Sequence, residues 1–395
     1  MTGTTNLWGM TKARQHHRIG TIISAVAALA TVLALSACAP AAHSGTATGT
    51  PHAHAGSGHG GSVPAPKPTP LAAPVTRVTK SCSQLVSAAA LTTSVGISVP
   101  FITPAATPDV TFGEDGALTC NWSDNLPQDQ MQASNHLVVW VLPDVPATNW
   151  ATALTTITEI GETKTTTITG DAYGWCNPAT PAGTICEVDT RVGTTWLSFE
   201  VESLSKTFAS SSAGLTHFAA LINPIVAAAG NASFVKEPKW VNPAATATPT
   251  TCDAALPTAE LTSATGIAGF DSIGPDLSDQ ESLAEYWGAE ANIGEVECDL
   301  ASPDQQNGVF GSIVPGGSWA WSFTAAADSA QAGYATVPSL GSQAVEYSNA
   351  NSGGLSIDWV RGGNLCNINV SLVNPAKQAA VALALATFIN GEIGS

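Results

Sequence analysis

The sequence predicts an α+β protein with two similar domains, each an antiparallel sheet packed with helices. Each half opens with a cysteine that leads a helix-like segment, at Cys82 and Cys252, and each has a later cysteine beside a strand-like run, at Cys120 and Cys298. Strand-like runs are clustered between helical segments instead of alternating with them one by one, which is typical of an antiparallel sheet. Each half also ends in a long apolar helix-like segment.

The expected elements have the same order in both halves: an opening helix, strands, a central helix, more strands and a terminal helix. The central helices follow Trp150 and Trp321. The alternation of apolar and polar residues from Trp196 to Val201 predicts a strand with one buried face. Two landmarks recur with equal spacing, which indicates a duplication. They are residues 150–170 and 321–341, and residues 189–201 and 358–370.

The first 37 residues have the pattern of a lipoprotein signal peptide: basic residues, then an apolar run at 19–35. The Leu-Ser-Ala-Cys sequence at 35–38 resembles a lipobox, which implies cleavage before Cys38 and a diacylglycerol on its sulfur, with acyl chains such as palmitate. The alternative is an uncleaved anchor, although about 17 apolar residues are few for a bilayer of roughly 30 Å. We expect an exported lipoprotein, held at the extracytoplasmic face of the cell membrane by lipid on Cys38.

The chain is strongly acidic, with 13 basic and 30 acidic residues and a net charge of −17. Loss of Lys12, Arg14 and Arg18 with the signal peptide leaves 10 basic residues and a net charge of −20. Such a surface repels phosphate backbones and anionic headgroups, so we expect no nucleic-acid partner and membrane attachment through the lipid alone. The 44% hydrophobic content is enough for a packed core.

Residues 38–78 lack apolar periodicity and are rich in Gly, Ser, Thr, Pro and His, which is typical of a flexible tether with a stiffer Pro-rich end. His52, His54 and His59 are weak candidate metal ligands, because imidazole suits zinc, copper or nickel. The alternative is a solvated low-complexity tract, since no carboxylate or thiol lies nearby to complete a closed site.

Beyond the signal peptide and this linker, roughly 315 residues remain, which suits about two domains. We place the first α+β domain at 79–235 and the second at 251–395. The connector between them, at 236–250, is rich in Pro, Ala and Thr, a composition typical of a domain boundary.

Several motifs resemble a group of actinobacterial surface lipoproteins that carry duplicated domains of unknown function. These motifs are the Cys-led helix, Cys-Asn-Trp at 120–122 and Gly-Asp-Ala at 170–172. The group is similar to the extracellular sensor domains of bacterial receptor Ser/Thr kinases. The second half departs from the pattern, with Asp-Leu at 299–300 and Ser-Gln at 342–343. The resemblance covers both halves and implies an α+β sandwich-like domain with no catalytic residues and an undefined ligand.

The equivalent positions of four cysteines predict the disulfides Cys82–Cys120 and Cys252–Cys298, because an exported location favours disulfide formation. Each would fix an opening helix to the sheet. The loops that they close span 38 and 46 residues, so each bridge stabilises by about 4 kcal/mol on the chain-entropy model.

Three cysteines of the folded part remain after these pairings. Cys176 and Cys186 flank a short loop that a disulfide between them would close; a metal site or a redox couple is the alternative, although the spacing is not Cys-x-x-Cys. Cys366 is left unpaired. We expect a buried, inert thiol, and the alternatives are a reactive free thiol or pairing with another chain.

Catalytic signatures such as His-Glu-x-x-His, Gly-x-Ser-x-Gly and a phosphate-binding Gly-rich loop are absent from the sequence. His136 and His217 are the only histidines beyond the linker, and we expect both to be structural. A triad assembled from distant residues is the alternative. We therefore predict no catalytic residue, no cofactor and no enzymatic activity.

The segment 270–299 is strongly acidic and lies in a long, loop-like insertion before Cys298. We expect a solvated acidic face, with cation binding as the alternative, although the EF-hand spacing is missing. The function expected from all these features is a ligand- or partner-binding module in a sensor or accessory role, serving a small ligand or a surface protein. The alternative is a metal- or cation-handling lipoprotein that uses the His-rich linker or this acidic segment.

Overall fold

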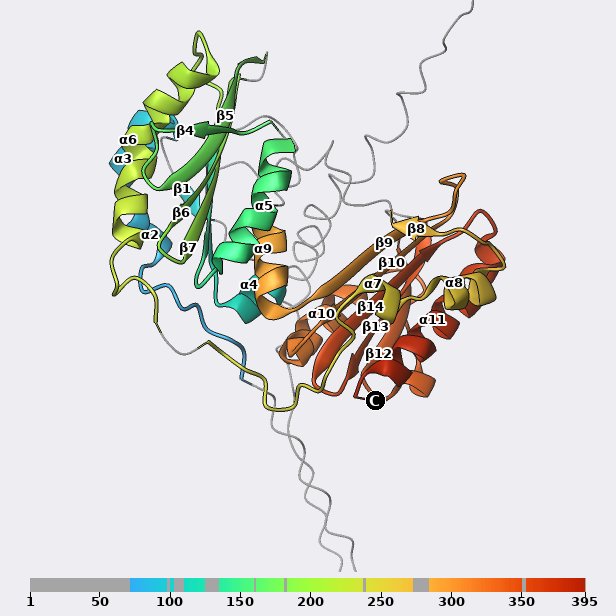
Figure 1. Cartoon of the computed structure of the whole chain (residues 1–395). Helices are drawn as coiled ribbons and strands as arrows, with labels where there is room; N and C mark the ends of the chain where they lie inside the picture. Colours follow the sequence, from blue (N-terminus) through green and yellow to red (C-terminus); the bar gives the residue numbers. More distant parts are fainter. Residues whose placement is uncertain are drawn as a thin grey trace, which may run out of the picture.

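A computed structural model gives the architecture of the folded part. It describes residues 72–97, 100–102, 110–124, 135–159, 161–180, 183–236, 239–272, 284–349 and 353–394. The expected signal peptide, Cys38, the candidate metal ligands His52, His54 and His59, and the middle of the acidic segment lie outside these residues. Within them the protein is mixed α+β, with two antiparallel sheets of seven strands each (Figure 1).

The first sheet has the strand order β1-β2-β3-β7-β6-β5-β4. Its strands are β1 Pro100–Ile102, β2 Leu118–Asp124, β3 His136–Leu142, β4 Thr163–Thr165, β5 Asp171–Thr180, β6 Gly183–Val192 and β7 Thr195–Ser203. The expected strand at Trp196–Val201 lies within β7, at the centre of the sheet. Both of its faces are covered by helices, so the expectation of a single buried face is wrong.

The second sheet, followed from β8, has the order β8-β9-β10-β14-β13-β12-β11. Its strands are β8 Asp271–Ser272, β9 Val296–Ala301, β10 Gly308–Val314, β11 Ala335–Thr336, β12 Ala344–Asn349, β13 Gly354–Arg361 and β14 Asn364–Ser371. The succession of strands matches that of the first sheet position by position, with the last strand of each half inserted beside the third.

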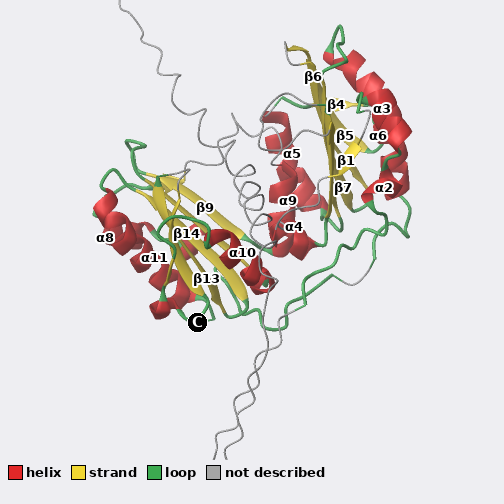
Figure 2. Ribbon diagram, turned by 180° about the vertical axis from the view of Figure 1, so that it is seen from behind, coloured by secondary structure: helices red, strands yellow, loops and turns green. Residues whose placement is uncertain are grey.

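Helices cover both faces of the first sheet (Figures 1 and 2). The opening helices α2 Cys82–Leu85 and α3 Ala88–Ser94 lie with the terminal helix α6 Ser211–Ala229 on one face, and α5 Ala147–Glu159 lies on the other. Within the described residues, α6 is the one helix long and apolar enough to cross a membrane, but much of it is buried against the sheet.

The second sheet carries corresponding helices. The opening helices α7 Cys252–Ala255 and α8 Thr258–Thr265 lie with the terminal helix α11 Gln378–Glu392 on one face. The short 3-10 helix η2 Gly317–Ala320 and α10 Trp321–Asp328 lie on the other, in the place of α5. This half also contains the 3-10 turns η3 Pro338–Leu340 and η4 Pro375–Lys377.

Among the residues that the structure describes, three disulfides join the same pairs that the sequence predicts. Cys82–Cys120 links α2 to β2, and Cys252–Cys298 links α7 to β9. Cys176–Cys186 joins directly opposite residues of the paired strands β5 and β6. Cys366 on β14 is buried and forms no disulfide within the described part of the chain.

Each half contributes one helix to a junction between the two sheets. α4 Val110–Asp115, from the first half, packs against η2 of the second half. α9 Ala284–Ile293, from the second half, packs against α5 and the sheet of the first half, and α4 and α9 also contact each other (Figures 1 and 2). The sequence predicted a loop-like acidic insertion here, so α9 is a correction: its small residues Gly288 and Ala289 are buried against the first half.

The connector is bound to the second half over part of its length. Asn242 Nδ2 donates to the carbonyl oxygens of Gly316, at 2.6 Å, and Gly363, at 3.1 Å. Thr246 N donates to the carbonyl oxygen of Gly362 at 2.7 Å, and Asn364 Nδ2 donates to the Thr246 carbonyl oxygen at 3.1 Å. We call α4 and α9 the exchanged helices, because each packs against the other half of the chain. These two helices and the hydrogen bonds of the connector join the halves at several points.

Candidate functional site

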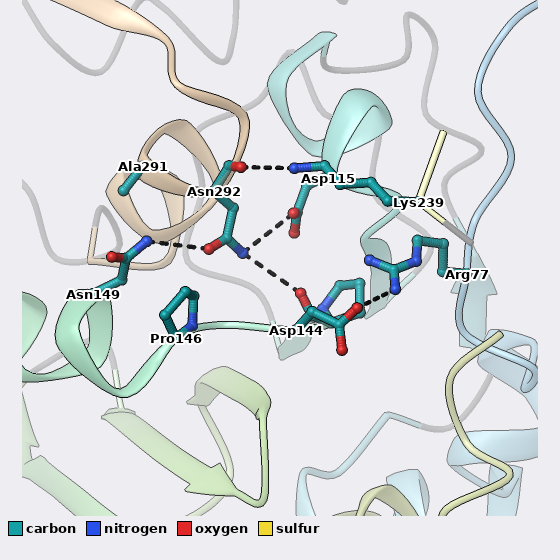
Figure 3. A pocket seen from close by; sticks show the side chains of 9 residues that line it. Arg77, Asp115, Asp144, Pro146, Asn149, Lys239, Ala291 and Asn292 are labelled. Carbon is teal, nitrogen blue, oxygen red and sulfur yellow. Dashed lines mark hydrogen bonds and ion pairs between the residues drawn. The ribbon is translucent and has the colours of Figure 1, made fainter. Parts of the chain in front are cut away.

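A polar cavity of about 250 Å³ lies at the junction, between the two halves of the chain (Figure 3). Its walls come from four separate segments: the entry to the first sheet, the end of α4, the β3–α5 connection and the end of α9, with the connector closing one side. The lining residues are Arg77, Asp115, Pro143, Asp144, Pro146, Asn149, Lys239, Ala291 and Asn292.

Asn292, near the end of α9, is the centre of the hydrogen bonds around this cavity (Figure 3). Its Nδ2 donates to Asp115 Oδ1 at 3.2 Å and to the Pro143 carbonyl oxygen at 3.5 Å. Its Oδ1 accepts from Asn149 Nδ2 at 3.2 Å, and its carbonyl oxygen accepts from Lys239 Nζ at 2.6 Å. One residue of the second half is thereby bonded through its side chain to α4 and α5 and through its main-chain carbonyl oxygen to the connector.

Asp115 is the last residue of α4 and is only 1% exposed. Its Oδ1 accepts from Asn292, while its Oδ2 has no hydrogen-bond partner among the described residues. Burial raises the pKa of Asp115 to about 7, against the opposing charge of Lys239. A buried carboxyl oxygen without a partner is costly, and a proton or a ligand that donates a hydrogen bond would satisfy it.

Asp144 is at the rim of the cavity and has a left-handed backbone with φ of 56°. Its carboxylate forms an ion pair with the buried guanidinium of Arg77, whose Nε donates to the Lys236 carbonyl oxygen at 3.2 Å. Non-glycine residues with positive φ cost free energy and cluster at ligand-binding and active sites. The cavity therefore combines a strained residue, a buried acid and two fixed cations, Arg77 and Lys239.

Three acidic residues of the 270–299 segment converge elsewhere at the junction. One carboxylate oxygen from each of Glu290, Glu295 and Glu297 lies within 4.8 Å of the others, beside a second cavity of about 290 Å³. Glu295 Oε2 accepts from Thr111 Oγ1 of α4 at 2.6 Å. Oxygen ligands of this kind suit hard cations such as calcium.

The two histidines of the folded part both have structural partners. His136 Nε2 lies 2.9 Å from Glu200 Oε1, and His136 Nδ1 lies 3.2 Å from Glu202 Oε2. Burial lowers the pKa of His136, but the hydrogen bonds to both carboxylates outweigh it and raise that pKa to about 9. His217 Nε2 bonds to the Ser94 carbonyl oxygen at 2.9 Å.

The structure thus brings together three members of the acidic segment and places both histidines in structural contacts. Sequence reasoning missed the junction cavity. Its central contact, Asn292 with Asp115, joins residues 177 positions apart, and neither belongs to a motif. The sequence showed that Asp144 and Asn149 follow a strand-like run. It did not show that a helix from the other half, α9, lies against them.

A scan against protein-family models and searches of curated proteins and solved structures all found no match.

Proposed function

We propose that this protein is an exported, lipid-anchored surface protein that binds a small polar ligand in the junction cavity, in a sensor or accessory role, without catalysing a reaction. The observation that carries this proposal is the cavity itself, lined by both halves and containing the partner-free oxygen of Asp115. Ligand sites favour such interfaces between domains. The engagement of both His136 ring nitrogens by Glu200 and Glu202 and the bond of His217 to a carbonyl oxygen support the absence of histidine-based catalysis.

The duplication belongs to the same proposal. We infer that the segments 79–235 and 251–395 descend from one module of the kind found in actinobacterial lipoproteins, as their motifs suggest. The matching strand order of the two sheets supports this, as do the equivalent disulfides from the opening helix to the second strand. A cavity between two such modules would let both contribute to one ligand.

A thermal-shift screen tests ligand binding at the cavity. The probes are ethanolamine, acetate, glycine and glycerol, which offer an ammonium group, a carboxylate, both together and only hydroxyls. We expect at least one probe to raise the melting temperature of the wild-type protein and to lose that effect in Asp115→Asn and Asn292→Ala. The exposed Asp253→Asn serves as the control and should respond like the wild type. Equal responses in all four proteins would contradict the cavity as the binding site.

Membrane attachment is tested separately, because Cys38 lies outside the described residues. Cys38→Ser should release the protein into the soluble fraction with its folded part unchanged. If that variant stayed membrane-bound, the lipid-anchor proposal would fail while the cavity proposal stood.

A second candidate function is cation binding, favoured by the convergence of Glu290, Glu295 and Glu297. Calorimetric titration with calcium, magnesium and zinc tests it. Binding heat that disappears in Glu297→Gln would support this function, and the absence of heat for all three ions would exclude it.

A further inference from the structure

Each half of the molecule buries a pair of carboxyl groups at the same place in its fold. In the first half, Asp189 of β6 faces Glu162, which follows the end of α5. In the second half, Asp358 of β13 faces Asp328, the last residue of α10. The two carboxyl groups of each pair lie within hydrogen-bonding reach of each other, and all four residues are at most 7% exposed.

The positions of the two pairs correspond in detail. Asp189 lies opposite Ser198 on β7, and Asp358 lies opposite Asn367 on β14, nine residues further along the chain in each case. The partner acid is the last residue of the central helix in the second half and lies just beyond the end of that helix in the first; in both halves this helix covers the junction-facing side of its sheet. The same arrangement in two halves of different sequence argues against an accidental contact.

One aspartate in each pair is supplied with hydrogen-bond donors. Asp189 Oδ1 accepts from Trp196 Nε1 at 2.6 Å, and Asp358 Oδ1 accepts from Asn367 Nδ2 at 2.7 Å. The partner acids are less well supplied. Asp328 is bonded by the Tyr347 hydroxyl and Glu162 by the backbone of Asp189, but in neither acid does this outweigh burial and the neighbouring aspartate. The donors favour the ionised form of the two strand aspartates, so the proton of each pair resides on the helix-end acid.

No cation neutralises either pair within the described residues that surround them. Around the first pair, Glu187 of β6 adds negative charge, and Arg191 of the same strand donates its Nη2 to the Val145 carbonyl oxygen. Of the other basic side chains on the described strands of this sheet, Lys164 of β4 is bound to Asp171 of β5 and His136 of β3 to Glu200 of β7.

Around the second pair, the titratable groups are the hydroxyl of Tyr347 on β12 and the thiol of Cys366 on β14. Burial, and then the charge of Asp358, raises the pKa of Asp328 to about 9. Burial and the neighbouring Asp189 likewise raise the pKa of Glu162 well above its usual range. Two carboxylates in contact cannot both ionise in such a site, as in other buried acid pairs.

We propose that the two acid pairs are proton-dependent latches, which hold α5 and α10 against their sheets and keep the junction intact only while each pair retains one proton. The consequence for the junction follows from the contacts of these two helices. Asn149 of α5 bonds to Asn292 of α9, and Trp319 of η2, directly before α10, donates to Glu114 of α4 at 2.5 Å. Release of either latch therefore loosens one of the two exchanged helices.

Infrared spectroscopy at pH 8 tests the protonated state directly. At this pH Glu114 and Asp115, whose pKa values burial raises to about 7, are mostly ionised. We expect the wild-type protein to show the carbonyl band of protonated carboxylic acid. Glu162→Gln and Asp328→Asn should each remove about half of the band, and the exposed Asp271→Asn should leave it unchanged.

The pH dependence of unfolding tests the latch. The folded wild-type chain binds protons that the unfolded chain releases, so its unfolding constant should rise with pH more steeply than that of a variant with a neutral side chain in the pair. For each retained proton, the extra rise should be up to about tenfold per pH unit. In hydrogen exchange compared at equal pH, α5 and α10 should lose protection above pH 9 in the wild type but not in the double variant Glu162→Gln/Asp328→Asn. Protection of α6 and α11 provides the internal reference.

Either of two results would overturn the proposal: no protonated-acid band in the wild type at pH 8, or parallel exchange profiles in wild type and double variant. Asp189→Asn and Asp358→Asn change the second member of each pair. If Glu162→Gln or Asp328→Asn fails to fold, the variant of the other member of that pair takes its place in the test. If every variant fails to fold, the wild-type band and the pH dependence of protection in α5 and α10 relative to α6 and α11 decide the question.

Discussion

Gly288 of α9 lies directly against the indole ring of Trp196 on β7, although the two residues belong to different halves of the chain. A Cβ atom at Gly288 would come closer than 3.0 Å to two carbons of that ring and within 3.2 Å of Leu142 Cδ2. Trp196 is fully buried and is itself fixed by its bond to Asp189 and by an edge-on contact with Trp150, with ring centroids 5.1 Å apart. The absence of a side chain at position 288 is therefore what allows α9 to reach the first half.

Gly288→Ala should destabilise the protein because neither the buried ring nor the helix has room to move. Overpacking of this kind costs about 1–3 kcal/mol, which outweighs the higher helix propensity of alanine. Urea unfolding measures the change. Gly391→Ala in α11 is the matched control, since no atom lies within 4 Å of its added Cβ, and it should be neutral or stabilising. Equal effects of the two substitutions would show that α9 does not pack on Trp196.

His136 should contribute to stability in a pH-dependent way. Its pKa is raised to about 9 by Glu200 and Glu202, so its contribution is complete below about pH 6.5 and is lost as the pH rises through 9. His136→Gln should lower the free energy of unfolding by about 1–2 kcal/mol at pH 7. The difference in the free energy of unfolding between wild type and variant should shrink toward pH 10, where histidine is as neutral as the glutamine that replaces it. A constant difference from pH 7 to pH 10 would contradict the ion pairs of His136 with Glu200 and Glu202.

The three disulfides should differ in their effect on stability according to the loops they close. On the chain-entropy model, replacement of Cys82–Cys120 or Cys252–Cys298 by serine pairs removes about 4 kcal/mol, because the loops span 38 and 46 residues. Replacement of Cys176–Cys186, with a separation of 10, removes about 3 kcal/mol. Urea unfolding of the three double variants checks this order. A larger loss for the short loop would show that its strand contacts, and not chain entropy, dominate.

The sequence was sufficient for features that depend on local pattern. The alternation around Trp196, the apolar terminal helices and the cysteines at equivalent positions each leave a signature within a few residues, and the structure has the corresponding strand, helices and disulfides. The equal spacing of Asp189 and Asp358 was also visible, although its meaning was not, because the partner acids come from another element.

The junction could not be predicted for a physical reason. α9 has a weakly amphipathic sequence, with acids on both sides of Gly288 and Ala289, so its composition indicates a solvated segment. Those two small residues pack on a surface of the first half that includes Leu142 and the Trp196 ring, about 90 residues earlier in the chain or more. The same holds for Asp115, whose burial depends on Asn292 and Lys239.

Cys366 should be unreactive in the folded protein and should report on the fate of Cys38. Its side chain is buried between the sheet and α11, and burial raises the pKa of its thiol, so the thiolate that reacts with disulfide reagents is scarce. We expect no thiol to titrate in the native protein. In urea without reductant, protein purified from membranes should show one thiol per chain, because six cysteines are in disulfides and, on the lipid-anchor proposal, a thioether would block the sulfur of Cys38. The Cys366→Ala variant should then show none.

Two outcomes would contradict these expectations. Two thiols in the unfolded wild type would mean that Cys38 carries no lipid. A rapidly reacting thiol in the native state would mean that Cys366 is not held in the core.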